Sequence, residues 1–473
     1  MTLLIDGQVG GQDHFTAFGE KVPDMRKHFD SGTKFGAAIG GWEDSPKFKV
    51  ALEDGTRKTF IENVMKFVAD YDLDLIDIDW EYPGGGGIDY KDDTPESKQR
   101  AVEAFPKLLR ELGDRLHAQQ KELSIAVAGK LDDIKVYEAK AAEIWGPVDF
   151  VNVMTYDLMN RRDTATAHSS SLQQADATIA RYVEGLKLPA EKVNLGFPLY
   201  AKFARLDDAT CQGPLGCKLA PAEDASGNDT HAMDAVTFET QHYQAERVTD
   251  LTDPGEGECG ANGRACAEGG QCCSRFGQCG TEPAHCGYMC QVQFGTGCDT
   301  AAFPDMMPLF REAMDKGVED RDAGAMWYIG GVGGGGGGGG QDSSPDHRYF
   351  WSWDSPAVVQ RKIDEIVRAR GLGGAMAWAL GEDSHSWEHV KAIRDGLASA
   401  AGDAVGAASG GAAPGTTTSG TGAGYPATSG PAAAATAAAG STAQLATAAS
   451  ASPTLSGGFT SEPGSSDGCK GSG

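Results

Sequence analysis

Several features that the sequence lacks narrow the function of this chain before any motif is considered. No run of Lys or Arg stands out, and Asp plus Glu number 67 against 41 for Lys plus Arg. Nucleic acid is therefore not an expected partner, because binding a phosphate backbone depends on clustered basic side chains. No stretch approaches the roughly 18 uninterrupted apolar residues that a membrane-spanning helix needs, so no membrane partner is expected either.

The eleven cysteines do not form paired C-x-x-C units, which argues against a zinc site, and no metal is expected. Eight of them fall between Cys259 and Cys298, and Cys211 and Cys217 lie close together upstream. Such density indicates disulfides and a secreted, oxidising location. No basic region with an apolar core and a cleavage site follows Met1, so we expect that a signal has been removed or that the gene model starts late.

The most informative stretch is a predicted strand in which acidic and apolar residues alternate. Asp77, Asp79 and Glu81 are two residues apart and are interleaved with Ile78 and Trp80. Because a strand repeats every two residues, the three carboxylates share one face. Their mutual repulsion raises at least one pKa and holds a proton near neutral pH, as a general acid requires. A proline and glycines then end the strand, so the acids lie near its carboxyl end, where barrel enzymes place their chemistry.

Two other interpretations of this stretch are weaker. Calcium binding by Asp72, Asp74, Asp77 and Asp79 would need polar, flexible spacers and a glycine at the sixth loop position, whereas the spacers here are Leu and Ile. A solvated acidic edge gives no reason to interleave Ile and Trp. The residues themselves therefore favour catalysis, while Asp74, on the opposite strand face, is expected to be structural.

Strands and helices alternate along the first 400 residues. Strands are predicted at 34–41, 75–81, 123–127, 148–157, 193–200 and 373–380, and helices at 60–68, 102–116, 134–145, 172–186 and 355–371. This alternation implies a parallel sheet, and six strands with polar or aromatic carboxyl ends favour a closed (β/α) barrel over an open doubly wound sheet.

The remaining segments divide the chain into parts. Glycines 333–340 are expected to form a flexible loop rather than a phosphate-binding loop. We expect a catalytic barrel over residues 1–400, interrupted by a small cysteine-rich module at 258–298. A tail rich in Ala, Gly, Ser and Thr at 401–473 is expected to be disordered.

The acidic strand resembles a known family signature. Asp74, Asp77, Asp79 and Glu81 match the D-x-x-D-x-D-x-E motif of family 18 glycoside hydrolases, the chitinases, in a style similar to fungal members. Further matches follow in order at Ala38–Gly41, Met154–Asp157, Gly196–Tyr200 and Gly374–Trp378. The resemblance implies an α/β fold, a (β/α)8 TIM barrel, and hydrolysis of the β-1,4-N-acetylglucosamine linkages of chitin by a substrate-assisted retaining mechanism.

The resemblance also implies roles for the acidic residues. Glu81 would protonate the leaving glycosidic oxygen, and the acetamido oxygen of the substrate would attack the anomeric carbon. Asp79 would orient the acetamido N–H and stabilise its positive charge, and Asp77 would share a proton with Asp79. Tyr156 would hydrogen-bond the acetamido oxygen, with Asp157 also lining the site.

Three further residues are expected at the substrate. By the same resemblance, Trp378 would form the floor under the sugar at the cleavage point. Trp42 would stack a sugar on the leaving-group side, and Met154 shares the inward face with Tyr156. No cofactor is implied, the partners are chitin and chitooligosaccharides, and a monomer is expected.

A second resemblance covers the cysteine-rich module, which is similar to a hevein-type chitin-binding module. The pairs that it implies are Cys259 with Cys273, Cys266 with Cys279, Cys272 with Cys286, and Cys290 with Cys298. Its binding residues carry over to Ser274 and Phe276. Gln278 and His285 stand where the family has aromatic rings, which should weaken sugar binding.

The sequence departs from the family pattern at two points. The first strand of the family barrel has no counterpart before Phe15, so the fold is expected to lack its first strand, and activity of the chain depends on that strand. Ala38 replaces a family serine. The alternatives to a chitinase are a non-catalytic chitin-binding lectin or effector, which usually lacks the glutamate, and an endo-N-acetylglucosaminidase acting on glycoproteins.

Overall fold

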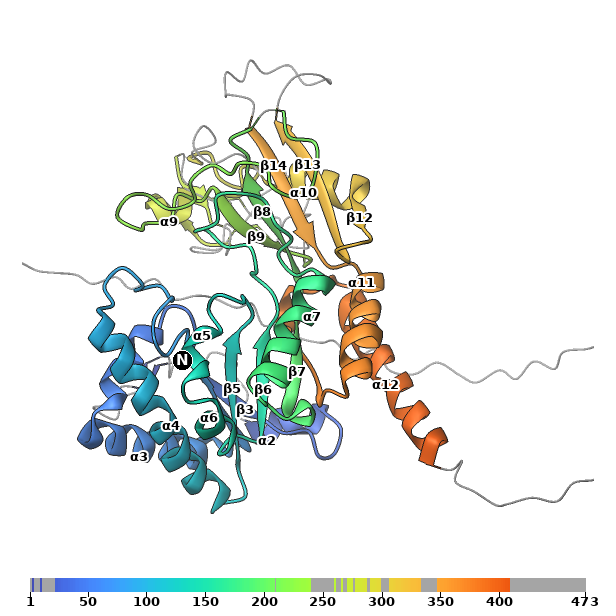
Figure 1. Ribbon diagram of the computed structural model, residues 1–473. Coiled ribbons are helices and arrows are strands. Elements are labelled where there is room, and N and C mark those ends of the chain that lie inside the picture. Colours follow the sequence, from blue (N-terminus) through green and yellow to red (C-terminus); the bar gives the residue numbers. More distant parts are fainter. Residues whose placement is uncertain are drawn as a thin grey trace, which may run out of the picture.

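The computed structural model describes residues 2–3, 9–10, 22–208, 210–239, 259–260, 265–266, 270–274, 277–286, 290–298, 306–332 and 347–408. Phe276, the glycine run at 333–340 and the tail from 409 onward lie outside these residues. The described chain forms a curled parallel sheet, an antiparallel sheet and a cysteine-rich module (Figure 1).

The parallel sheet positions the acidic residues. Its strands are, in spatial order, β15 (Gly374–Trp378), β7 (Val193–Pro198), β6 (Phe150–Met154), β5 (Glu122–Ala128), β4 (Leu75–Asp79) and β3 (Gly36–Gly40). Because the strands are parallel, their carboxyl ends meet at one edge. Among the described residues, no strand pairs with the outer sides of β3 and β15. The expected barrel lacking its first strand is confirmed in the form of this half-barrel.

Helices cover the outer surface of the curled sheet (Figure 1). They are α2 (Val22–Met25), α3 (Asp54–Tyr71), α4 (Pro95–His117), α5 (Lys135–Glu138), α6 (Ala141–Trp145), α7 (Leu172–Ala180), α11 (Pro356–Lys362) and α12 (Glu388–Ala408). The Thr94 side chain accepts from Ser97 N at the start of α4, and Ser355 accepts from Val358 N at the start of α11. Each cap satisfies an amide that the helix leaves free. The predicted helix at 134–145 is instead the two short helices α5 and α6.

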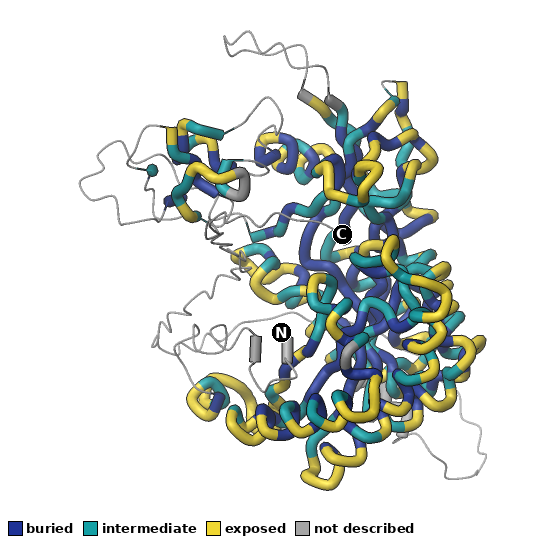
Figure 2. Tube along the Cα trace, turned by 90° about the vertical axis from the view of Figure 1, so that its left-hand side faces the viewer, coloured by how far each residue is buried: buried dark blue, intermediate teal, exposed yellow. Residues whose placement is uncertain are grey.

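A second sheet, which the sequence did not lead us to expect, is inserted between β7 and β15. It is antiparallel, in the order β12 (Val318–Asp320), β13 (Ala325–Val332), β14 (His347–Trp353), β8 (Tyr200–Arg205) and β9 (Met233–Thr237), and α10 (Met306–Lys316) packs against it. The predicted strand at 193–200 therefore ends at Pro198, and Tyr200 begins a strand of the other sheet. Figure 2 shows buried residues along both sheets.

The cysteine-rich module holds β10 (Cys272–Cys273), β11 (Cys279–Gly280) and α9 (Pro283–Cys286). Its disulfides join Cys259 to Cys273, Cys266 to Cys279, Cys272 to Cys286, and Cys290 to Cys298. These are the pairs that the second resemblance implies. A further disulfide joins Cys211 to Cys217 upstream.

The two ends of the described chain are a short strand pair and a long helix. β1 (Thr2–Leu3) pairs with β2 (Val9–Gly10), and α12 continues to Ala408, past the tail boundary expected at residue 401. Of the helices that the structure describes, none combines the length and apolar character needed to cross a membrane.

Candidate active site

The carboxyl end of β4 carries the three predicted acids. Trp80 is buried, stacks on Phe48 with ring centroids 5.3 Å apart and meets Phe105 edge-on at 5.4 Å. This apolar anchor holds one face of the strand against α4. Because side chains alternate along a strand, Asp77 and Asp79 share one face of β4, and Glu81 follows two residues beyond its end.

Asp77 is buried and held by neighbouring strands. Ser124 Oγ donates to Asp77 Oδ1, and Asn152 Nδ2 donates to the same oxygen at 3.1 Å. Asn194 Nδ2 in turn donates to Asn152 Oδ1 at 3.1 Å, so a polar chain runs from β4 to β7. Burial raises the pKa of Asp77, and the hydrogen bonds from Ser124 and Asn152 oppose that rise.

Asp79 differs from the other two carboxyls because one of its oxygens is buried without a hydrogen-bond partner among the described residues. Its side chain is 8% exposed, and among the described residues Oδ1 has no hydrogen-bond partner. Burial raises its pKa well above the usual range, and the negative charges of Glu81 and Asp77 raise it further. A buried acceptor without a donor is costly, so this oxygen is a place where a ligand N–H would be stabilised.

The backbone next to Asp79 requires glycine. Gly40 has φ +110°, and a Cβ at this position would lie 2.2 Å from the Asp79 carbonyl oxygen. Gly41 N donates to that oxygen at 2.8 Å. The glycines of the predicted Ala38–Gly41 motif therefore let β3 approach the acidic strand closely.

Glu81 is fixed through its backbone. Its N–H donates to Ser45 Oγ at 2.7 Å, and Ser45 Oγ donates to Gly41 O at 2.8 Å. The pKa of Glu81 is raised to about 7, chiefly by burial, with a hydrogen bond from Tyr82 lowering it and the charge of Asp157 raising it. A carboxylic acid that keeps its proton near pH 7 is suited to general acid catalysis.

Tyr156 and Asp157 follow β6, as the predicted motif requires. Burial is the main cause of the raised pKa of Tyr156, and the charges of Asp79 and Glu81 raise it further, so its hydroxyl stays a donor. Asp157 Oδ1 accepts from Tyr200 Oη at 3.0 Å and from Lys202 Nζ at 2.8 Å. β8, which carries both Tyr200 and Lys202, therefore orients Asp157.

The predicted aromatic and apolar residues lie at the same edge of the sheet. Trp378 ends β15 and is 51% exposed, an unusual exposure for so large an apolar side chain. Trp42 lies two residues beyond β3, and Arg161 and Arg162 lie over its ring at 5.8 and 6.0 Å from the centroid. Met154 ends β6 and is buried. Asp74, by contrast, binds Arg26 at 2.6 Å and Phe35 N at 2.8 Å, which agrees with its predicted structural role.

The second resemblance implies two binding residues in the cysteine-rich module, Ser274 and Phe276. Ser274 is 3% exposed, and its Oγ accepts from Gln278 N at 3.1 Å inside the module. Phe276 lies outside the described residues. A binding role for either stays a prediction.

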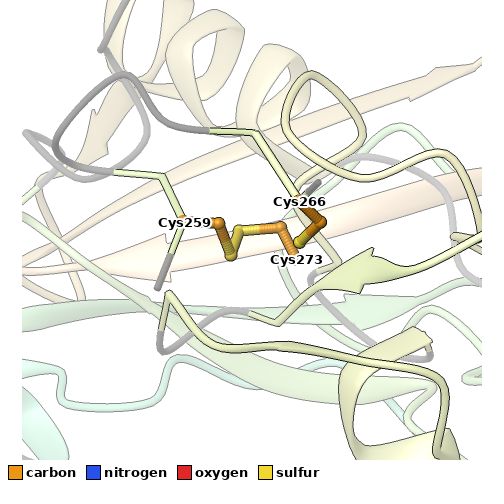
Figure 3. A group of neighbouring side chains, drawn as sticks. All are labelled: Cys259, Cys266 and Cys273. Atoms are coloured by element: carbon orange, nitrogen blue, oxygen red, sulfur yellow. A yellow bond between two sulfur atoms is a disulfide. The ribbon is translucent and has the colours of Figure 1, made fainter. Parts of the chain in front are cut away.

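Three cysteine sulfurs of the module are close enough to suggest a metal site. Sγ atoms of Cys259, Cys266 and Cys273 lie within 4.8 Å of one another (Figure 3). Each belongs to a disulfide, two of them to the same one, so none offers a free thiolate. These side chains therefore do not suit metal ligation.

Sequence reasoning missed several residues that support the acids: Ser45, Ser124, Asn152, Asn194 and Lys202. The alternation of side chains along a strand could have identified some of them. Asn152 has the same parity as Met154 and Tyr156, so it faces the same way as the predicted site residues. Lys202 had no such signal, because it belongs to the inserted sheet.

Comparisons with known proteins agree with this geometry. Residues 6–383 match the model of the family described as glycosyl hydrolases family 18. The chain is 29% identical over 181 residues to chitinase A1 of Niallia circulans, covering 35% of this chain and 26% of that protein. It is 32% identical over 182 residues to chitinase 1 of Aphanocladium album, covering 35% of this chain and 40% of the other. The chain thus spans less than half the length of either curated relative.

Solved structures share the fold. The Group IV chitinase of Ostrinia furnacalis, in complex with allosamidin, is similar with a TM-score of 0.55 at 17% identity, over 84% of this chain and 89% of the other. A chitinase-like agglutinin of Robinia pseudoacacia is similar with a TM-score of 0.51 at 17% identity, over 84% of this chain and 90% of the other. Fold alone therefore does not separate hydrolysis from sugar binding.

Proposed function

Because the chain belongs to the glycosyl hydrolases of family 18, we propose that it cleaves β-1,4-linked N-acetylglucosamine chains with Glu81 as the general acid. The observation that carries the proposal is the pairing of a buried Asp79 with a partly buried Glu81 two residues on. Glu81 holds a proton up to about pH 7, and Asp79 presents an acceptor oxygen that has no partner among the described residues. Similarity to two proteins named chitinases supports the choice of substrate.

In the proposed first step, bond breaking and bond making are divided between enzyme and substrate. The Glu81 proton passes to the glycosidic oxygen, and the bond from that oxygen to the anomeric carbon breaks. The acetamido oxygen of the same sugar forms the new bond to the anomeric carbon, giving an oxazolinium ion. Asp79 Oδ1 accepts the acetamido N–H, and the Asp79 carboxylate stabilises the positive charge that develops there.

In the second step, the Glu81 carboxylate takes a proton from water, and the resulting hydroxide opens the oxazolinium ion. Two displacements at one carbon leave the product with the configuration of the substrate. Asp77, held by Ser124 and Asn152, supports Asp79 by sharing the proton of the pair, so that the two carboxyls titrate together. Trp378 supplies an exposed ring under the sugar, and Tyr156 an O–H donor beside the acetamido oxygen.

The lectin alternative is disfavoured by the environment of Glu81. A protein that only binds sugar has no need of a carboxyl whose pKa is raised to about 7. A chitinase-like agglutinin shares the scaffold, so an experiment must separate hydrolysis from binding.

The anomeric form of the first product tests the proposed mechanism. We expect chitohexaose treated with the protein to give products whose new reducing ends are initially β, because the reaction proceeds through two displacements. Proton NMR during the first minutes, before mutarotation, measures the ratio of β to α anomers. Initial release of the α anomer would exclude the oxazolinium route, and release of no product would support the lectin alternative.

We propose that the cysteine-rich module binds insoluble chitin next to the active site. It is inserted in the chain between β7 and β15. In Figure 1 it lies beside the antiparallel sheet, above the half-barrel. Its four disulfides suit an oxidising, secreted location, where a polymeric substrate is met.

Deleting residues 258–298 is expected to lower the fraction of protein that sediments with chitin beads several-fold, because one of two sugar-binding surfaces is lost. Turnover of soluble chitohexaose should stay unchanged and serves as the control for folding. Unchanged sedimentation with chitin would show that the module is structural only.

A further inference from the structure

The stretch Asn228-Asp229-Thr230 has no part in the proposed catalytic site, yet it carries a pattern with a chemistry of its own. The chain contains six asparagines, and only after Asn228 does a Ser or Thr stand two positions later, with no Pro between. This pattern is the acceptor of N-linked glycans in secreted proteins. Because so short a pattern also arises by chance, the surroundings of Asn228 decide whether a sugar fits there.

Asn228 lies near the tip of an exposed hairpin in the chain between β8 and β9. Glu223 pairs with Asp229 in an antiparallel bridge, and Asp224 N donates to Asn228 O at 2.9 Å. Both Asn228 and Thr230 are exposed. A glycan is bulky and hydrated, so it is accommodated on surface loops of this kind and not in a packed element.

The Asn228 amide can carry a sugar and keep its place in the turn. Its Nδ2 donates to Asp224 Oδ2 at 2.8 Å, and Asn228 N donates to Asp224 Oδ1 at 2.9 Å. A primary amide has two N–H groups, and N-glycosylation replaces only one of them. The N–H that remains can still donate to Asp224, so the turn accepts the modified residue without rearrangement.

The sides of the hairpin are tied to neighbouring loops, so a sugar at its tip would have a fixed place on the surface. Arg161 Nε lies 2.9 Å from Glu223 Oε1, and Arg161 Nη1 lies 3.5 Å from Asp229 Oδ2. Lys91 Nζ donates to Ala225 O at 3.1 Å. These ties position the hairpin while its tip stays exposed.

The cysteines give an independent reason to expect glycosylation. A disulfide joins Cys211 to Cys217 shortly before the hairpin, and four more cross-link the cysteine-rich module. Disulfides form in the oxidising compartment through which secreted proteins pass. In a eukaryotic cell, N-linked glycans are attached in that same compartment, so a chain that acquires these disulfides also encounters the glycosylating enzyme.

We infer that Asn228 carries an N-linked glycan. In the transfer, the Asn228 amide nitrogen forms a bond to the anomeric carbon of the first sugar of an oligosaccharide that is linked to a lipid pyrophosphate. The bond from that carbon to the pyrophosphate oxygen breaks, the lipid pyrophosphate leaves, and the amide nitrogen gives up one proton. The inference is independent of the proposed function, because no step of the proposed hydrolysis uses Asn228.

Expression of the full chain behind a yeast secretion leader tests the inference. Its peptides are treated in heavy-oxygen water with an amidase that removes only Asn-linked glycans, which leaves an isotope-labelled aspartate at each former attachment site. Mass spectrometry is expected to find the label at position 228 in the parent and in Thr230→Ser, which keeps the acceptor pattern. Thr230→Val, which has a similar shape but lacks the hydroxyl, is expected to lose the label.

A gel measurement complements the peptide analysis. Amidase treatment should speed the migration of the parent and leave that of Asn228→Gln unchanged. Secreted and cell-retained protein are analysed together, so that a variant that folds poorly is still scored. A parent without label at position 228 would overturn the inference, and so would label that persists in Thr230→Val. Either result would leave the proposed hydrolysis standing, because that is tested separately by turnover of chitohexaose.

Discussion

Replacing Glu81 by Gln is expected to lower kcat on chitohexaose by about 10²–10⁴-fold, the usual contribution of a positioned general acid. Gln occupies nearly the same volume and its backbone N–H can still donate to Ser45 Oγ, so the loop should keep its conformation. The loss would therefore report the missing proton rather than a displaced loop. KM should change much less than kcat, because the glutamate acts on the bond that breaks.

A matched control for this variant is Glu53→Gln, a change of the same type on a side chain 64% exposed that pairs with Arg100. The Glu53→Gln variant should have the same kcat as the parent within experimental error. Circular dichroism of both variants would show whether the fold is kept. Turnover by Glu81→Gln equal to that of the parent would rule out Glu81 as the acid and leave the family mechanism without its proton donor.

The second large effect concerns stability and centres on a buried ion pair. Lys362 of α11 and Asp354 are each at most 1% exposed, and Lys362 Nζ lies 2.5 Å from Asp354 Oδ2. Ser170 Oγ donates to Asp354 Oδ1 at 3.0 Å, and His389 Nε2 lies 3.0 Å from the Asp354 backbone oxygen. The pair thus joins the end of β14 in the inserted sheet to helices of the half-barrel.

Lys362→Met is expected to lower the free energy of unfolding by about 3–5 kcal/mol, because it leaves the Asp354 charge buried without its cation. Urea denaturation followed by tryptophan fluorescence measures the change. The double variant Lys362→Met/Asp354→Asn removes both charges and should recover part of the loss. Lys316→Met, which breaks an exposed pair with Glu312, should cost at most about 0.5 kcal/mol. A Lys362→Met variant as stable as the parent would show that the pair does not hold the two sheets together.

The acidic strand shows how much of the site the sequence contains. The period of two predicted one face for Asp77, Asp79 and Glu81; in the structure Asp77 and Asp79 are buried residues of β4, Trp80 is buried beside them, and the charge of Glu81 acts on Asp79. The same parity argument applied to β6 would have added Asn152, which holds Asp77. Local periodicity is enough here because neighbouring parallel strands bring residues of matching parity side by side.

The inserted sheet shows where such reasoning ends. β8 pairs with β14, where Arg205 lies opposite Tyr349, and no local pattern specifies a partner so distant in the chain. As a result, the strand predicted at 193–200 runs two residues past the end of β7, and the contacts of Tyr200 and Lys202 with Asp157 were not predicted.

The central claim is that Glu81 donates a proton from a pKa of about 7, and the pH dependence of kcat tests it most directly. Burial raises this pKa, so the acid is protonated and active below it and loses its proton above it. On chitohexaose, kcat of the parent protein should fall by roughly tenfold per pH unit above about pH 7, and the residual activity of Glu81→Gln should lack this fall. A parent profile that stays level to pH 9, or the same fall in Glu81→Gln, would contradict the claim.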